Sequence, residues 1–151
     1  MEPDNKKAIL LAEDEPLLAN LLKQRLEKES FRVFHAKDGE EAIKMIPEVK
    51  PELMLLDLIL PKMSGFEVME KISQMPELAV LNVPIVVISN LGQESDVKKA
   101  QSLGAVGYFI KAQLSFEDLV SQVKNFFGVS DVENNEDAKD VLTSPSVPAE
   151  A

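Results

Sequence analysis

The stretch LMLLD, residues 53–57, places four consecutive apolar residues directly before an aspartate. A strand that alternates apolar and polar residues has one face in water, whereas an uninterrupted apolar run is typical of a strand buried on both faces of a parallel sheet. The stretches AILLA at 8–12 and IVVIS at 85–89 have the same character. We therefore expect these three strands to lie inside a sheet that helices cover on both faces.

Helical segments separate these apolar runs along the chain. Residues 16–29 carry leucines with helical spacing, and Pro16 suits the first turn of a helix. Parallel strands must be joined by crossover connections, which are almost always right-handed. We therefore expect an α/β fold, a doubly wound five-stranded parallel sheet with helices on both faces. The expected strands are 8–12, 32–36, 53–57, 85–89 and 107–110, and the expected helices with their caps are 16–29, 38–46, 64–75, 95–103 and 115–127.

The composition bounds the kind of protein that this chain can be. Its 151 residues are 45% hydrophobic, which is enough for one domain with a buried core. It has no cysteine and a single histidine, His35, which excludes a disulfide framework, a cysteine nucleophile and a metal site built from several histidines. No apolar run is long enough to cross a bilayer, and the N-terminus does not resemble a secretory signal. We therefore expect a cytoplasmic protein without a membrane partner.

The formal net charge of -10 is divided between two unlike parts of the chain. Residues 1–128 contain 15 basic and 20 acidic side chains, whereas residues 129–151 contain 1 and 6. The second part has no aromatic residue and is rich in Ser, Asn, Asp and Glu, so we expect one domain over 1–128 and a disordered acidic tail over 129–151. Neither part predicts a strongly basic face, which argues against direct binding to nucleic acid.

Polar side chains follow the ends of four expected strands. Glu13 and Asp14 follow the first, Asp57 ends the third, Ser89 ends the fourth and Lys111 follows the fifth. Ligands of open parallel sheets bind beyond these ends, where the strand order reverses. Each residue alone also fits a plainer role, such as a turn or helix cap, a favourable acid at a helix start, or a solvated lysine. Their joint placement favours a shared site.

The carboxylates of Glu13, Asp14 and Asp57 would repel one another at close range unless a cation lay among them. Mg²⁺ binds to proteins through one or two carboxylates together with water and phosphate. The ammonium of Lys111 could neutralise charge on a phosphoryl group in transfer, and Ser89 could hydrogen-bond one of its oxygens. The residues therefore predict a site for a divalent cation and a phosphoryl group.

Four segments carry a more specific signal: LLAEDEP at 10–16, DLILPKMSGFE at 57–67, VISN at 87–90 and GYFIK at 107–111. In this order and spacing they resemble the receiver domains of bacterial response regulators in two-component signalling, among them the chemotaxis regulator. The resemblance extends over about residues 6–128. It implies a flavodoxin-like fold with the strand order 2-1-3-4-5, which the apolar pattern alone leaves open.

The resemblance also implies a role for each residue of the acidic group. Asp57 is expected to accept the phosphoryl group. Asp14 is expected to bind Mg²⁺ or Mn²⁺ directly, and Glu13 to act on the ion through water. The backbone carbonyl of Ile59 would complete the ligands that the protein supplies.

Ser89 and Lys111 would form the pair that senses the phosphoryl group, and Tyr108 the aromatic switch that turns inward when Ser89 moves. If Tyr108 is only a residue of a half-buried edge strand, its rotamer would not change.

The family usually has a cis proline after the lysine, but here the residue is Ala112. A cis bond to alanine would cost about 3–4 kcal/mol. The departure therefore favours a trans Lys111–Ala112 bond and a different path for the following loop.

The function that the resemblance implies is signalling, not catalysis on other molecules. A phosphohistidine on a histidine kinase or phosphotransfer protein would donate its phosphoryl group to Asp57, and the domain would assist its own phosphorylation and dephosphorylation. The product would bias a two-state surface that contacts an unidentified protein target or forms a homodimer. Because no second domain is expected after residue 128, the output would be protein–protein contact, unless the chain is a fragment of a longer regulator.

Two other classes of protein share parts of this pattern. A phosphatase of the haloacid dehalogenase type places a second aspartate two residues after the first, where this chain has Ile59. A pseudo-receiver that only binds partners would not need the intact set of polar residues. In the family, Ile59 and Leu91 occupy positions that border the path of the hydrolytic water, and their apolar side chains predict a long-lived phosphorylated state.

Overall fold

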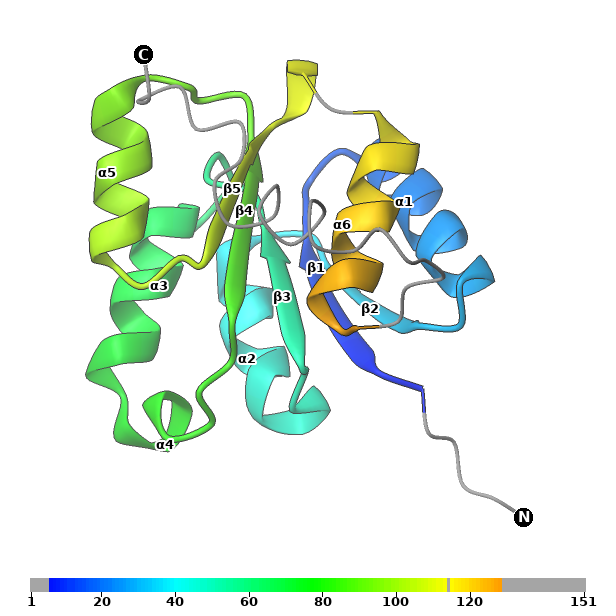
Figure 1. Ribbon diagram of the computed structural model, residues 1–151. Coiled ribbons are helices and arrows are strands. Elements are labelled where there is room, and N and C mark those ends of the chain that lie inside the picture. Colours follow the sequence, from blue (N-terminus) through cyan, green and yellow to red (C-terminus); the bar gives the residue numbers. More distant parts are fainter. Residues whose placement is uncertain (1–5, 114, 129–151) are drawn as a thin grey trace.

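The computed structural model describes residues 6–113 and 115–128, which form a five-stranded parallel sheet with helices on both faces (Figure 1). The strand order is β2-β1-β3-β4-β5, which confirms the predicted doubly wound fold. The predicted tail at 129–151 lies outside the described residues. The strands are β1 (Ala8–Ala12), β2 (Arg32–Ala36), β3 (Leu53–Leu56), β4 (Ile85–Ser89) and β5 (Gly107–Ile110).

Within the described residues, six α-helices and one short 3₁₀ helix connect and follow the strands. None of these described helices is both long and apolar enough to cross a lipid bilayer. The helices are α1 (Pro16–Lys28), α2 (Gly39–Val49), α3 (Gly65–Gln74), α4 (Pro76–Ala79), α5 (Glu94–Ser102), the 3₁₀ helix η1 (Lys111–Gln113) and α6 (Phe116–Phe126).

Two hydrophobic cores lie on the two faces of the sheet, because successive side chains of a strand point to opposite faces. One core includes Leu10, Met54 and Val87 and is covered by α2, α3, α4 and α5. The other includes Ile9 and Leu55 and is covered by α1 and α6, which lie side by side in Figure 1. Every residue of β1, β3 and β4 is buried, as their continuous apolar runs predict.

Side chains of Ser64, Ser115 and Asp38 cap the first turns of α3, α6 and α2. At α3, the Oγ of Ser64 accepts a hydrogen bond from the N–H of Glu67 (3.1 Å), and the Glu67 carboxylate accepts one from the N–H of Ser64 (2.9 Å). A serine also caps α6. At α2, Asp38 accepts from the N–H of Glu41, but the Glu41 carboxylate accepts from the N–H of Lys37 and not from that of Asp38. Asp38 therefore caps α2, but the reciprocal bond that would complete a capping box is not formed.

Other differences from the sequence prediction occur where elements are short or end. Helix α2 continues past Ile46 to Val49 although it contains Pro47, since the proline removes a donor close to the helix end, where little helix is left to disrupt. Strand β3 ends at Leu56, so Asp57 begins the loop. Neither α4 nor η1 is predicted, because helices of 4 and 3 residues are too short for helical periodicity to be recognised.

The loop from β3 to α3 packs so closely against the starts of α2 and α3 that only glycine fits at positions 39 and 65. A Cβ at Gly65 would lie 2.4 Å from the carbonyl oxygen of Asp57, and a Cβ at Gly39 would lie 2.0 Å from that of Met63. The N–H of Gly39 also donates to the carbonyl oxygen of Pro61 (3.3 Å). The starts of α2 and α3 therefore fix the loop that follows Asp57.

Candidate functional site

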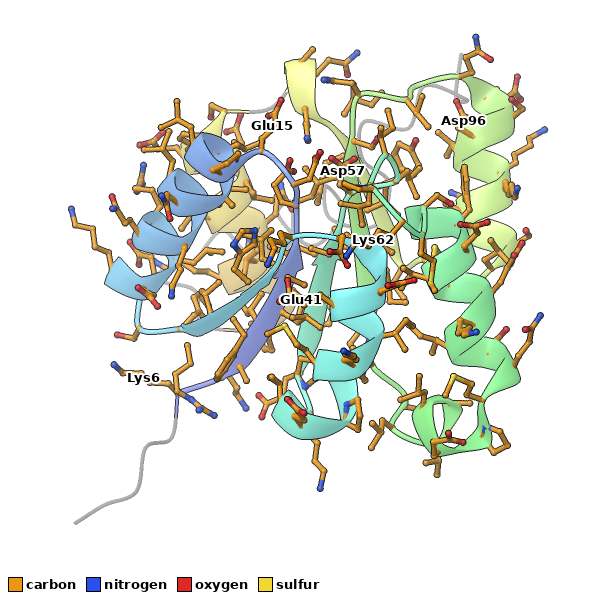
Figure 2. All side chains as sticks on the ribbon, turned by 180° about the vertical axis from the view of Figure 1, so that it is seen from behind. Lys6, Glu15, Glu41, Asp57, Lys62 and Asp96 are labelled. Atoms are coloured by element: carbon orange, nitrogen blue, oxygen red, sulfur yellow. The ribbon has the colours of Figure 1, made fainter. Side chains whose placement is uncertain are left out.

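The carboxyl ends of β1, β3 and β5 bring three charged side chains together. Nζ of Lys111 lies 2.8 Å from Oδ2 of Asp57 and 2.9 Å from Oε1 of Glu13. Both carboxylates are almost fully buried, with 4% of Asp57 and 1% of Glu13 exposed. In Figure 2, Asp57 lies at the end of the molecule where Glu15 precedes α1, opposite the end that carries Lys6. Three distant segments of the chain thus meet at one edge of the sheet.

The backbone of neighbouring segments fixes Asp57. Its N–H donates to the carbonyl oxygen of Ala12 (3.1 Å), which continues the pairing of β3 with β1 by one residue. Its Oδ1 accepts a hydrogen bond from the N–H of Ile59 (3.1 Å). Ile59 is 56% exposed, so one apolar side chain lies on the surface beside the acid. One carboxylate oxygen is therefore held by the backbone, while the other faces Lys111.

Burial and ion pairing act against each other in this cluster. Burial raises the pKa of the Glu13 carboxyl above its usual value, and Asp57 adds to this effect, while Lys111 and the N–H of Glu15 oppose it. Burial disfavours the charge of Lys111, but its hydrogen bonds to Asp57 and Glu13 outweigh burial and raise the pKa of Lys111. The ammonium is therefore the counter-ion that two buried carboxylates share.

Asp14 completes a group of three carboxylates. One oxygen from each of Glu13, Asp14 and Asp57 lies within 4.8 Å of the others, and only Asp14 is exposed. Both oxygens of Glu13 already accept hydrogen bonds, from Lys111 and from the N–H of Glu15. Both oxygens of Asp57 likewise accept hydrogen bonds, from the N–H of Ile59 and from Lys111, so the exposed Asp14 is the most available ligand. Grouped carboxylate oxygens, one of them on the exposed Asp14, fit a hard divalent cation such as Mg²⁺, which keeps several waters when it binds.

Ser89 and Tyr108 contact the backbone of the same residue, Leu91, in the loop after β4. Ser89 is fully buried, and its Oγ accepts a hydrogen bond from the N–H of Leu91 (3.3 Å). The hydroxyl of Tyr108 donates to the carbonyl oxygen of Leu91. Tyr108 is 1% exposed, although β5 is an edge strand of the sheet. The side chain already points inward, and its movement together with Ser89 stays a prediction.

The buried Tyr108 gives a pH-dependent prediction, because the chain has no other tyrosine and no tryptophan. Burial, and then the charges of Asp96 and Asp57, raise the pKa of Tyr108 to about 12. We expect tyrosinate absorbance to appear near that pH in the folded protein, but near pH ~10 in urea. The unfolded chain loses its phenolic proton at a lower pH than the folded protein does. The contribution of the neutral phenol to the free energy of unfolding is therefore full below roughly pH 10 and is lost as the pH rises further. The same ionisation midpoint in buffer and in urea would contradict a buried hydroxyl.

The loop after β5 contains the departure at Ala112. The Lys111–Ala112 bond is trans, as the cost of a cis bond to alanine predicts, and η1 starts at Lys111. The ammonium of Lys111 nevertheless reaches Asp57. The alanine therefore leaves the lysine at the site.

Two contacts of the site were not predicted from the sequence. One is the ion pair of Lys111 with Glu13, because the sequence places both residues at strand ends without showing which charges meet. The other is the contact of His35 with the β1–α1 loop, where Nε2 lies 2.7 Å from the backbone carbonyl oxygen of Glu13. No sequence signal marks His35 for this contact, since it is an ordinary position in a short strand.

Comparison with known proteins gives matches over most of the described residues. The chain matches the response regulator receiver domain over residues 9–124. It is 34% identical over 119 residues to the chemotaxis protein CheY of Halobacterium salinarum, covering 78% of this chain and 96% of that protein. It is 38% identical over 107 residues to the alkaline phosphatase synthesis transcriptional regulatory protein PhoP of Bacillus subtilis, covering 71% of this chain. That match spans only 42% of PhoP, less than half of its length.

A solved structure gives the same result. The Mn(2+)-bound form of response regulator Rcp1 has a TM-score of 0.69 and 30% sequence identity, covering 84% of this chain and 97% of that one. The region that matches the family, residues 9–124, includes all the acidic residues of the site together with Ser89 and Lys111. The chain belongs to the response regulator receiver domain family.

Proposed function

We propose that this receiver domain accepts a phosphoryl group on Asp57 from a phosphohistidine of a histidine kinase or phosphotransfer protein. The observation that carries the proposal is the position of the Asp57 carboxylate, which is buried at the carboxyl edge of the sheet and lies 2.8 Å from the ammonium of Lys111. Two further carboxylates lie beside it. A single ammonium does not balance three carboxylates, so the group attracts further positive charge.

The residues of the chain have distinct tasks in such a transfer. An oxygen of Asp57 forms a bond to phosphorus, while the bond from phosphorus to the donor imidazole nitrogen breaks and the nitrogen keeps the electron pair. The N–H of Ile59 orients the carboxylate through Oδ1, and a fixed orientation favours in-line attack. Lys111 lies against Oδ2 and stabilises the charge that the phosphoryl oxygens carry during the transfer.

We propose that Asp14, Asp57 and the backbone carbonyl of Ile59 bind Mg²⁺ or Mn²⁺ directly and that Glu13 acts through water. A bound divalent cation would neutralise negative charge on the phosphoryl group. Support comes from the grouped carboxylate oxygens and from the Mn(2+)-bound form of the related Rcp1. Glu13 is buried whereas Asp14 is exposed, which favours Asp14 over Glu13 as the direct ligand.

The proposed output is a change of the face that α5, β5 and α6 form. The peptide groups of Leu91 link Ser89 to Tyr108, since the N–H bonds to the serine and the carbonyl oxygen to the tyrosine. A movement of Ser89 towards a phosphoryl oxygen would therefore release or shift the peptide that holds Tyr108. We propose that this biases a two-state surface towards contact with a protein target or a second copy of the chain.

Phosphorylation by a small donor tests this function without knowledge of the natural kinase. Phosphoramidate has the phosphorus–nitrogen bond of phosphohistidine and suits the experiment. We expect intact-mass spectrometry to show the addition of one phosphoryl group in the presence of Mg²⁺, and none when the metal is chelated. No addition with Mg²⁺ would contradict the proposed function.

The phosphorylated state is expected to be long-lived, because apolar side chains border the site. Ile59 is exposed beside Asp57, and the half-buried Leu91 lies two residues after Ser89. Neither side chain can hydrogen-bond a water, and positioning of the attacking water is most of what hydrolysis requires. Ile59→Asn combined with Leu91→Glu should lose its phosphoryl group about tenfold faster, the effect of ~1.4 kcal/mol in barrier height.

The decay is measured by intact mass after the donor is removed. Val80→Asn is a matched control, because Val80 is also an exposed apolar residue but follows α4, away from the charged cluster. Its decay rate should equal that of the unmodified protein. If the loop at Ala112 opens the site and controls hydrolysis, the double variant will decay at the unmodified rate, and the role of Ile59 and Leu91 is then ruled out.

A further inference from the structure

We propose that His35 is a positioning residue for the divalent cation, because its ring fixes the peptide group that joins Glu13 to Asp14. The inference rests on the proposed function, since Asp14 is the carboxylate that would bind the ion. His35 belongs to β2, the edge strand on the side of the sheet opposite β5. Strand β2 supplies no ligand to the ion, but its His35 would fix the position of Asp14, which is a ligand.

The backbone of Glu13 is tied to β2 at both its N–H and its carbonyl. The N–H donates to the carbonyl oxygen of Ala36 (3.0 Å), which continues the regular pairing of β1 with β2. The carbonyl oxygen lies 2.7 Å from Nε2 of His35. After Ala36 the chain turns towards the β3–α3 loop, where the N–H of Gly39 donates to Pro61. The imidazole therefore donates where a longer strand would have offered a backbone amide.

The chemistry of the contact determines which ring nitrogen carries hydrogen. A carbonyl oxygen can only accept a hydrogen bond, so Nε2 of His35 must be protonated and must donate. A separation of 2.7 Å is at the short end of the normal range for such a bond. His35 is half-buried, which limits competition from water. The ring therefore holds the Glu13 carbonyl in one direction.

This restraint matters more for Asp14 than for Glu13. The Glu13 carboxylate is held independently by Lys111 and by the N–H of Glu15. Asp14 is exposed, and its backbone begins at the peptide whose carbonyl the ring holds. Without the ring, binding of the cation would have to order that peptide. The entropy of ordering one residue is enough to weaken binding roughly tenfold.

A structural role for His35 would have a different signature. If the ring only fills space beside β1, a side chain of similar bulk should replace it whether or not that side chain can donate. Leucine has similar bulk without a donor, whereas the amide of glutamine places an N–H about as far from the backbone as Nε2. The two substitutions therefore separate positioning from packing.

The experiment measures the Mg²⁺ affinity of the full chain by isothermal titration calorimetry, for the unmodified protein, His35→Leu and His35→Gln. We expect His35→Leu to raise the Kd about tenfold and His35→Gln to restore most of the affinity, with similar melting temperatures of the two variants without metal. Equal affinities in all three proteins, or equal weakening in both variants, would overturn the inference alone. An unmodified protein that binds no Mg²⁺ would overturn the proposed metal site, and the inference with it.

A second measurement on the unmodified protein does not depend on how the variants fold. His35 is the only histidine, so a long-range ¹H–¹⁵N spectrum contains the signals of one imidazole. In mildly alkaline buffer we expect hydrogen on Nε2 and none on Nδ1, and we expect the Nε2–H to exchange slowly with water. A ring protonated only at Nδ1, or an Nε2–H that exchanges at the rate of a free imidazole, would overturn the proposal.

Discussion

Replacement of Asp57 by asparagine should abolish the mass increase that phosphoramidate and Mg²⁺ produce. The amide is nearly isosteric with the carboxylate, but it lacks the charged oxygen that attacks phosphorus. The fold should persist, because Lys111 then faces only the Glu13 carboxylate, a one-to-one pair. The single amide oxygen can accept either from the N–H of Ile59 or from Lys111, and Lys111 keeps its pair with Glu13 in both cases. Intact-mass spectrometry before and after treatment measures the loss directly.

Asp38→Asn is the matched control for this experiment. Asp38 is also a buried aspartate near the carboxyl edge, but it caps α2 and is not part of the group of three carboxylates. Asparagine caps helices about as well as aspartate, so this variant should fold and gain the phosphoryl mass. An undiminished mass increase in Asp57→Asn would show that another residue is the acceptor.

Asp14→Ala should weaken Mg²⁺ binding by at least a factor of about a hundred, since even the loss of an outer-shell partner typically costs about 10–100-fold. Asp57 and Lys111 stay in place in this variant, so the effect isolates the exposed ligand. Without metal, the melting temperature should be unchanged or slightly higher, because one of three neighbouring like charges is removed. Calorimetric titration with Mg²⁺ and thermal unfolding in a chelator measure the two effects.

The Glu15→Ala variant tests whether Asp14 binds the cation directly or only contributes negative charge. Glu15 is the next residue and is also exposed, but its carboxylate is not part of the group, and only its backbone N–H contacts Glu13. Removing this charge should change the Mg²⁺ affinity by a small, salt-dependent factor. Equal losses in Asp14→Ala and Glu15→Ala would mean that the cation responds to the general negative field, not to a ligand at Asp14.

The sheet was predictable because strands that are buried on both faces consist of uninterrupted apolar residues. Leu53–Leu56 and Ile85–Ser89 have no polar residue before the strand end, and the structure buries all of them. The positions of Asp57 and Lys111 at one edge followed from the same reasoning, since parallel strands all end on that edge. Conversely, the helix through Pro47 could not be predicted, because helix ends depend on packing that overrides local propensity.

The finer contacts of the site depend on loops and side-chain reach, which periodicity does not encode. Lys111 could have met any of three carboxylates, and only the folded loops decide that it bonds Glu13 and Asp57 while Asp14 stays exposed. The hydrogen bond of His35 follows from where β2 ends relative to β1. A strand can end one residue earlier or later without any change in its apolar pattern, so this contact is not encoded in the pattern.

The strand order also shapes how the domain forms on the ribosome. Domains begin to fold while their chain is still emerging, and here β1 emerges first but lies between β2 and β3. Glu13 and Asp57 therefore come together early, whereas Lys111 follows Asp57 by 54 residues. Burial of unpaired charges is costly, so the nascent sheet should stay hydrated at this edge until β5 joins β4. The lysine that serves the finished site therefore arrives with the last strand of the sheet, and among the described elements only α6 follows it.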